Sequence, residues 1–139
     1  MKHIVSGLVL VVIVGCLTPL RSYAGDEVQD GRAQQGKLWY DKYCTPCHGA
    51  GGAPGSAVFA ATKKPIDLRT YAQRNGGRFP SERWWDLVFS YRPRGVHADV
   101  WQRIRNDQKE TVEVERDITA HTVVANIEFY VVSIQNTNK

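Results

Sequence analysis

Cysteine and methionine are both scarce in this chain, and their scarcity removes several classes of function. The 139 residues include three cysteines and one methionine. Cys16 lies in an apolar N-terminal segment, so only Cys44 and Cys47 remain for the body of the protein. A single local pair excludes a disulfide-stapled scaffold. Because the only methionine is Met1, no internal methionine can serve as a metal ligand.

Long apolar runs are missing as well. The longest, residues 4–14, is too short to span a membrane and has the form of a signal-peptide core. A short basic start precedes it, and Ser22-Tyr23-Ala24 offers a small-x-small cleavage site. The sequence therefore predicts a periplasmic or otherwise exported protein, with a signal peptide over residues 1–24 and one domain over residues 25–139.

Two other fates of the N-terminus stay open. Ile13-Val14-Gly15-Cys16 resembles a bacterial lipoprotein box, in which Cys16 would become the lipidated first residue. Retention as an uncleaved anchor is the remaining option. The membrane would be a partner in these two cases only.

Strong charge of one sign is also absent. The chain has 18 basic and 14 acidic residues. Cleavage after Ala24 removes Lys2 and Arg21 but no acidic residue, which leaves 16 basic residues and a net charge of about +2. No basic run with interleaved aromatics is present, so we expect no nucleic-acid partner.

The feature that stands out is Cys44-Thr45-Pro46-Cys47-His48, the C-x-x-C-H attachment signature of a c-type haem. Positions i, i+3 and i+4 share one face of a helix, so both thiols and the imidazole can meet one flat macrocycle. The motif predicts one covalently bound haem c with its iron. Cys44 and Cys47 would form the thioethers and His48 the proximal ligand. A haem-free dithiol or zinc site is an alternative interpretation. The motif occurs only once, however, and without the second ligand cluster that a zinc site would need.

Helical periodicity surrounds this motif. From Gly31 onward, Ala33, Gly36, Tyr40 and Cys47 share a face. Gly36 inside a helix costs about 1 kcal/mol relative to alanine, which indicates close approach of another helix. Residues 25–35 are polar and predict a loosely docked start. A backbone carbonyl near Pro54, in the glycine-rich loop after His48, is expected to accept the other ring N–H of His48.

Further along, three more helices are predicted from caps and apolar spacing. They cover residues 68–74 after Asp67 with a stop at Asn75-Gly76-Gly77, residues 82–90 after Ser81, and residues 118–134 after Asp117. The last carries a long apolar stripe that includes Ile127 and Tyr130. Residues 106–117 are predicted to be a solvated loop.

These features resemble class I cytochromes c, over residues 31–135. In that family a glycine and an aromatic residue on the N-terminal helix cross an aliphatic and an aromatic residue on the C-terminal helix. Gly36 and Tyr40, then Ile127 and Tyr130, match those positions. The resemblance implies that the domain over residues 25–139 has an all-α cytochrome c fold, in which short helices and loops wrap one haem. It also implies an electron carrier with redox partner proteins, rather than an enzyme.

A narrower bacterial subgroup of this family carries D-L-x-x-x-A-x-R-N-G-G-x-F-P, as residues 67–80 do here. In that subgroup a later H-G-x-x-x-M-P-V-W stretch supplies a methionine ligand, but this chain has Ala98 at the methionine position. His97, next to it, is the expected distal ligand. His/His ligation would give a lower potential than His/Met ligation.

Other distal arrangements stay open. The subgroup has a histidine just before its methionine that does not bind iron. If His97 corresponds to that histidine, it is not a ligand, and the distal position of the iron would be open or occupied by water. That arrangement would suit a gas sensor or a catalytic haem subunit, with Arg94 or His97 acting on a peroxide. Lys63, Lys64 or Tyr91 are further candidate ligands. His121 is read as a surface or core histidine.

Overall fold

All the regular structure that the computed structural model describes is helical, as the sequence predicted. The described residues are 23–54, 65–89 and 97–136. Their elements, in chain order, are α1 (Tyr23–Tyr43), α2 (Thr45–His48), η1 (Ala50–Gly52), η3 (Leu68–Thr70), η4 (Gln73–Asn75), α3 (Ser81–Val88), α4 (Ala98–Asn106) and α5 (Glu113–Ser133).

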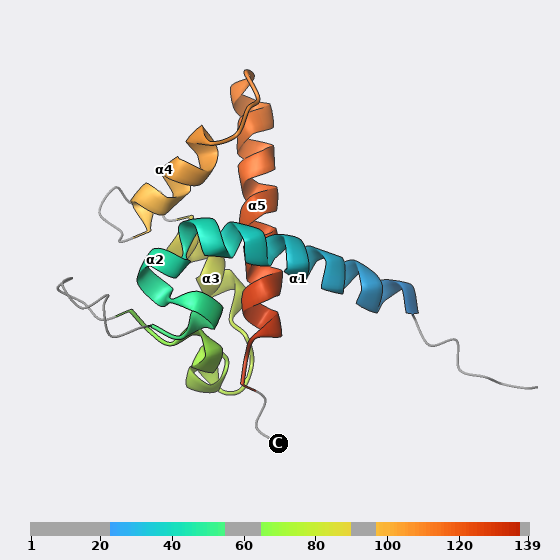
Figure 1. The fold of residues 1–139 in the computed structure, drawn as a ribbon, viewed down its shortest axis with the longest axis vertical. Coiled ribbons are helices and arrows are strands. Elements are labelled where there is room, and N and C mark those ends of the chain that lie inside the picture. Colours follow the sequence, from blue (N-terminus) through green and yellow to red (C-terminus); the bar gives the residue numbers. More distant parts are fainter. Residues whose placement is uncertain (1–22, 55–64, 90–96, 137–139) are drawn as a thin grey trace, which may run out of the picture.

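The fold is built on the crossing of the two longest helices, α1 and α5 (Figure 1). Gly36 is the contact point: a Cβ on this residue would lie 1.8 Å from the backbone oxygen of Asn126. One turn later, Tyr40 is fully buried and its ring centre lies 5.0 Å from that of Tyr130. The predicted role of Gly36 is therefore confirmed.

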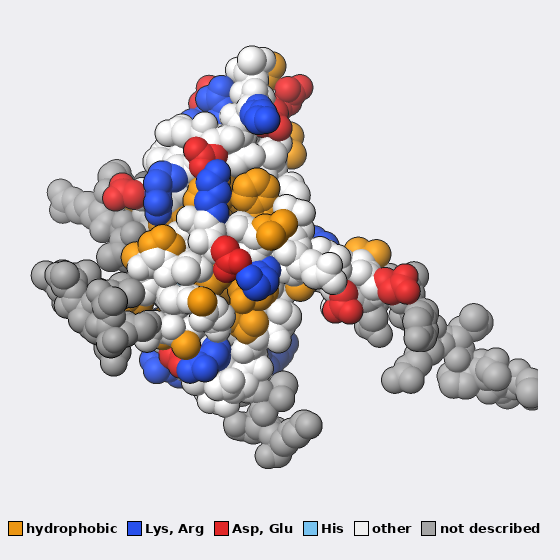
Figure 2. Space-filling view, viewed as in Figure 1, with side chains coloured by type: hydrophobic (Ala, Val, Ile, Leu, Met, Phe, Trp, Pro, Cys, Tyr) orange, Lys and Arg blue, Asp and Glu red, His pale blue; other side chains and the backbone are white. Residues whose placement is uncertain are grey.

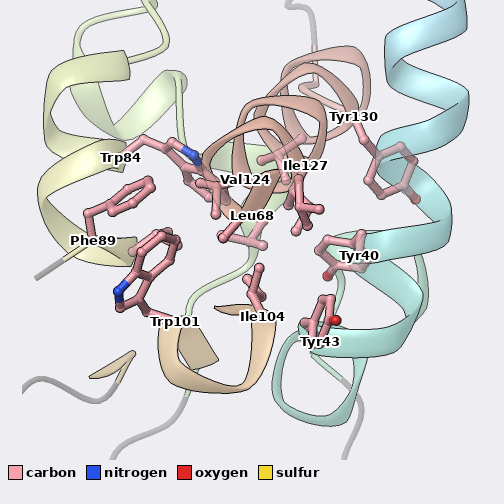
Figure 3. Packing of buried hydrophobic residues seen from close by; sticks show 14 of the residues in the cluster. Tyr40, Tyr43, Leu68, Trp84, Phe89, Trp101, Ile104, Val124, Ile127 and Tyr130 are labelled. Atoms are coloured by element: carbon pink, nitrogen blue, oxygen red, sulfur yellow. The ribbon is translucent and has the colours of Figure 1, made fainter. Parts of the chain in front are cut away.

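A single apolar cluster fills the space beside this crossing (Figure 3). The C-terminal stripe is buried as predicted, with Val124 and Ile127 at its centre. Trp101 and Ile104 of α4 pack onto the same cluster, and the Trp101 ring lies 4.3 Å from the ring of Phe89. These contacts join the middle of the chain to α5.

The sequence did not predict α4, and the predicted starts of α1 and α5 were too late. Residues 25–35 belong to α1 rather than to a loose start, because extending an existing helix costs little once it has nucleated. In Figure 1 this early part of α1 projects beyond α5. Asp117 does not cap α5, which begins a turn earlier. Its carboxylate instead binds Arg105 of α4.

The predicted caps had mixed outcomes. Asp67 is an N-cap and accepts a hydrogen bond from the backbone N–H of Arg69 at 3.0 Å. The expected helix after it is two 3-10 turns, and Gly76 ends the second with a φ of +74°. Ser81 is the first residue of α3 rather than its cap.

Charges of both signs are interspersed with apolar groups over the face seen in Figure 2. Within the described ranges, no helix is long and apolar enough to cross a membrane. The predicted signal-peptide core and Cys16 lie outside those ranges.

The crossing gives a direct test with a matched control. Gly36→Ala is expected to lower the free energy of unfolding by about 1–3 kcal/mol or more, because the added methyl group meets rigid backbone. Gly31→Ala lies on the same helix with nothing within 4 Å, and it should leave stability unchanged or raise it by up to about 1 kcal/mol. Urea unfolding measures both. Equal effects would show that the crossing does not need a glycine.

Candidate functional site

The C-x-x-C-H segment is helical, as its spacing predicted. The backbone N–H of Cys44 continues the hydrogen bonding of α1 to Tyr40, and the N–H of His48 bonds to the carbonyl of Cys44 at 2.9 Å. Cys44 is half-buried, Cys47 is exposed, and neither forms a disulfide. The two thiols and the imidazole therefore come from one short helical segment.

The environment of Cys44 disfavours a redox dithiol. Burial raises the pKa of its thiol to about 12, against a smaller opposing effect of Arg103. Reactive cysteines in dithiol oxidoreductases have lowered pKa values, because the thiolate is the nucleophile. Cys44 is therefore protonated at neutral pH and suited to a covalent or structural role.

The His48 ring is oriented by a backbone carbonyl, but not the one expected. Its Nδ1 lies 3.1 Å from the carbonyl oxygen of Ile66, so the prediction of a carbonyl near Pro54 was wrong. Because a carbonyl can only accept, Nδ1 carries the proton and Nε2 keeps a free lone pair. Burial lowers the pKa of His48, and the bond to Ile66 partly offsets this. The ring is therefore a neutral imidazole at neutral pH.

The Ile66 carbonyl is held by the turns that follow it. Gln135, just after α5, donates from Nε2 to the carbonyl of Leu68 at 2.8 Å and accepts from the N–H of Ala72 at 2.8 Å. The N–H of Asn136 bonds to the carbonyl of Arg69 at 2.7 Å. The C-terminal end of the chain thus fixes the segment that orients His48. Only the Asp67 cap signalled a fixed turn here, and Gln135 carried no recognisable signal.

His97 immediately precedes α4, and its ring faces that of His48. The ring centres are 6.2 Å apart and the two planes differ by 13°. Burial lowers the pKa of His97 and proximity to His48 lowers it further, whereas a hydrogen bond to the backbone of Leu87 raises it. The structure thus brings together the two histidines that the sequence singled out, although they are 49 positions apart.

The remaining candidates lie elsewhere or outside the described residues. His121 is exposed, its ring stacks 4.4 Å from that of Phe89, and its Nδ1 lies 2.6 Å from the carbonyl oxygen of Asp117. The other candidates, Lys63, Lys64, Tyr91 and Arg94, fall in segments that the structure does not describe.

Two buried donors were not anticipated. Tyr71 Oη and Trp84 Nε1 have no hydrogen-bond partner among the described atoms, although both side chains are at least nine-tenths buried. A buried donor without an acceptor costs about 1–3 kcal/mol. Such atoms in a native protein call for an acceptor beyond the described atoms, such as a water molecule or a bound group.

Comparisons with protein-family models, curated proteins and solved structures found no match for this chain. Within the described ranges, no group of three or more His, Cys, Asp or Glu side chains is arranged to hold a metal ion. The paired imidazoles are therefore the main chemical feature of the site.

Gln135 provides a test of how the site is supported. Gln135→Ala is expected to lower the free energy of unfolding by about 2 kcal/mol, because it removes two part-buried hydrogen bonds: the acceptor of the Ala72 N–H and one of the two donors to the Leu68 carbonyl. Gln34→Ala, at an exposed position of α1, should change it by less than about 0.5 kcal/mol. Thermal unfolding of the full chain measures both. Equal and small changes would show that Gln135 does not anchor the turn.

Proposed function

We propose that this protein is an exported c-type cytochrome that binds one haem covalently and carries electrons. Cys44 and Cys47 hold the macrocycle, and His48 and His97 are the two axial ligands. The observation that carries the proposal is the facing pair of imidazoles, one of which belongs to the C-x-x-C-H motif. The polypeptide has the all-α class that such a fold requires.

The separation of the rings suits a metal ion between them. When a nitrogen of each ring points at the metal, two metal–nitrogen bonds of about 2 Å each, plus about 1 Å from each nitrogen to its ring centre, add up to about 6 Å. The centres of the two near-parallel rings are 6.2 Å apart. Each ring also has a hydrogen bond to a backbone carbonyl, which leaves its other nitrogen free for a metal. Two imidazoles alone leave most of the coordination positions of an iron ion unfilled. A macrocycle that supplies four more nitrogens completes the set.

Other residues of the core would suit this cofactor. Tyr71 Oη and Trp84 Nε1, which lack a partner among the described atoms, would serve as donors to the propionate oxygens of a haem. The helix crossing at Gly36 and Tyr40 supports the resemblance to class I cytochromes c. The high pKa of Cys44 argues against the haem-free dithiol alternative.

Electron transfer follows from the ligand set. The haem iron supplies a one-electron couple when it is bound. With an imidazole on each face, no coordination position is left for a substrate. The protein's own task is then to keep both rings neutral and oriented in the two oxidation states, which the carbonyls of Ile66 and Leu87 serve. His/His ligation would place the potential below that of a His/Met site.

Spectroscopy after maturation with haem tests the proposal. The wild type is expected to show a c-type pyridine haemochrome and a low-spin spectrum in both oxidation states. His97→Ala should keep the covalent haem but become high-spin and bind CO readily, because it loses only the distal ligand. His121→Ala removes an exposed histidine and should retain the low-spin spectrum.

The outcomes separate the alternatives. If the chain takes up no haem c, the whole proposal is wrong. A high-spin wild type that binds CO at once would favour the gas-binding or catalytic reading. Loss of the low-spin spectrum in His121→Ala, but not in His97→Ala, would reassign the distal ligand.

A further inference from the structure

The helix α4, which begins directly after His97, is fixed at its opposite end. Residue 107 lies ten positions after His97, which is about 15 Å along a helix. Near that end, Arg105 binds the carboxylates of Asp117 and Glu113 on α5, the latter at 2.6 Å. Between the two ends, Trp101 and Ile104 are buried in the core. α4 is therefore anchored at its middle and its end, and His97 lies at its start.

A second tie connects the end of α4 to the haem-attachment motif. Asp107 accepts a hydrogen bond from the hydroxyl of Tyr43 at 2.9 Å, and its carboxylate lies 2.8 Å from Nζ of Lys42. Tyr43 is 3% exposed and directly precedes Cys44. Figure 3 shows Tyr43 and Ile104 on neighbouring sides of the same cluster. This tie joins the segment that carries the proximal ligand to the helix that carries the distal one.

The two anchors of α4 act on different helices. Arg105 fixes α4 to α5, which carries no proposed ligand, whereas Asp107 fixes it to the end of α1, where the haem would be attached. Rotation of α4 about its buried middle would move His97 and Asp107 together. Whatever holds Asp107 against Tyr43 therefore also limits how far His97 can move away from His48.

We infer that Asp107, through Tyr43, is a positioning residue that keeps His97 in place as the distal ligand. This inference rests on the proposed function, because it concerns ligation of the iron by His97. The Asp107 carboxylate touches neither histidine. It acts by holding α4 at a fixed distance from the C-x-x-C-H segment, and its loss would let the distal ligand leave more often.

The rate of CO binding to the reduced haem protein measures how often His97 leaves the iron. At saturating CO, the observed rate reports how often the distal ligand leaves the iron. Asp107→Ala and Tyr43→Phe are each expected to raise that rate about tenfold, the effect of losing one hydrogen bond to a charged group. The double variant should be no faster than Asp107→Ala, because that substitution already removes the hydrogen bond that Tyr43→Phe removes. The ion pair of Asp107 with Lys42, which only Asp107→Ala removes, is exposed and contributes little. Asp107→Asn keeps an acceptor for Tyr43 and should restore most of the wild-type rate.

A surface ion pair on α1, the helix that carries Tyr43, supplies the control. Lys37 lies 2.5 Å from Asp41 on α1, with both side chains exposed, and Lys37→Gln should leave the CO rate unchanged. A merely structural role for Asp107 would lower the melting temperature of Asp107→Ala without changing the CO rate, and would overturn the inference. So would additive effects in the double variant.

Failure of the inference is distinguishable from failure of the proposed function. A low-spin wild type whose CO rate is unaffected by either substitution overturns the role of Asp107 alone. A wild type without a c-type spectrum, or with an open distal position, overturns the proposed function and this inference with it.

Discussion

The backbone contact between α1 and α5 is the constraint on which the rest of the structure depends. The position of Gly36 against the carbonyl of Asn126 fixes how closely the two long helices approach. Arg32 reinforces the crossing with a hydrogen bond from Nε to the side-chain oxygen of Asn126 at 3.1 Å. Because the C-x-x-C-H segment continues directly from α1, the crossing also sets where that segment lies relative to the core.

The two histidines are supported in similar ways from opposite parts of the chain. His48 ends α2, and its ring is oriented by a carbonyl in the turn before η3. His97 starts α4, and the backbone of Leu87, in α3, supports its ring. Backbone carbonyls cannot change with a side-chain substitution, so the orientation of both rings depends on the path of the chain. That path is fixed by distant contacts, such as those of Gln135.

The features that the sequence predicted are those with a local cause. A glycine one turn before an aromatic residue, an aspartate before a turn and an apolar stripe each act within a few positions of themselves. The structure placed Gly36, Asp67 and Ile127 as expected for this reason. The helical form of Cys44 to His48 also follows from spacing alone. The closeness of His97 to His48 was expected only through a resemblance, since no local rule connects residues so far apart in the sequence.

The features that the sequence missed depend on tertiary contacts. An isolated helix as short as α4 is marginal in water, so its formation relies on burial of Trp101 and Ile104 and on the ion pairs of Arg105. The same ion pairs explain why α5 starts before Asp117, which resembles a cap but is used by α4. The carbonyl of Ile66 has no side-chain signature at all, and no reading of residue types could have selected it.

These differences make the two sides of the site unequal in stability. The His48 side is continuous with α1, whose crossing buries Tyr40 completely. The His97 side belongs to a nine-residue helix held by two apolar side chains and a few polar ties at its far end. Regions with few buried contacts open at lower free energy than the core around them. The start of α4 should therefore open before the α1–α5 crossing does, so that His97 would move away while the segment of His48 stays folded.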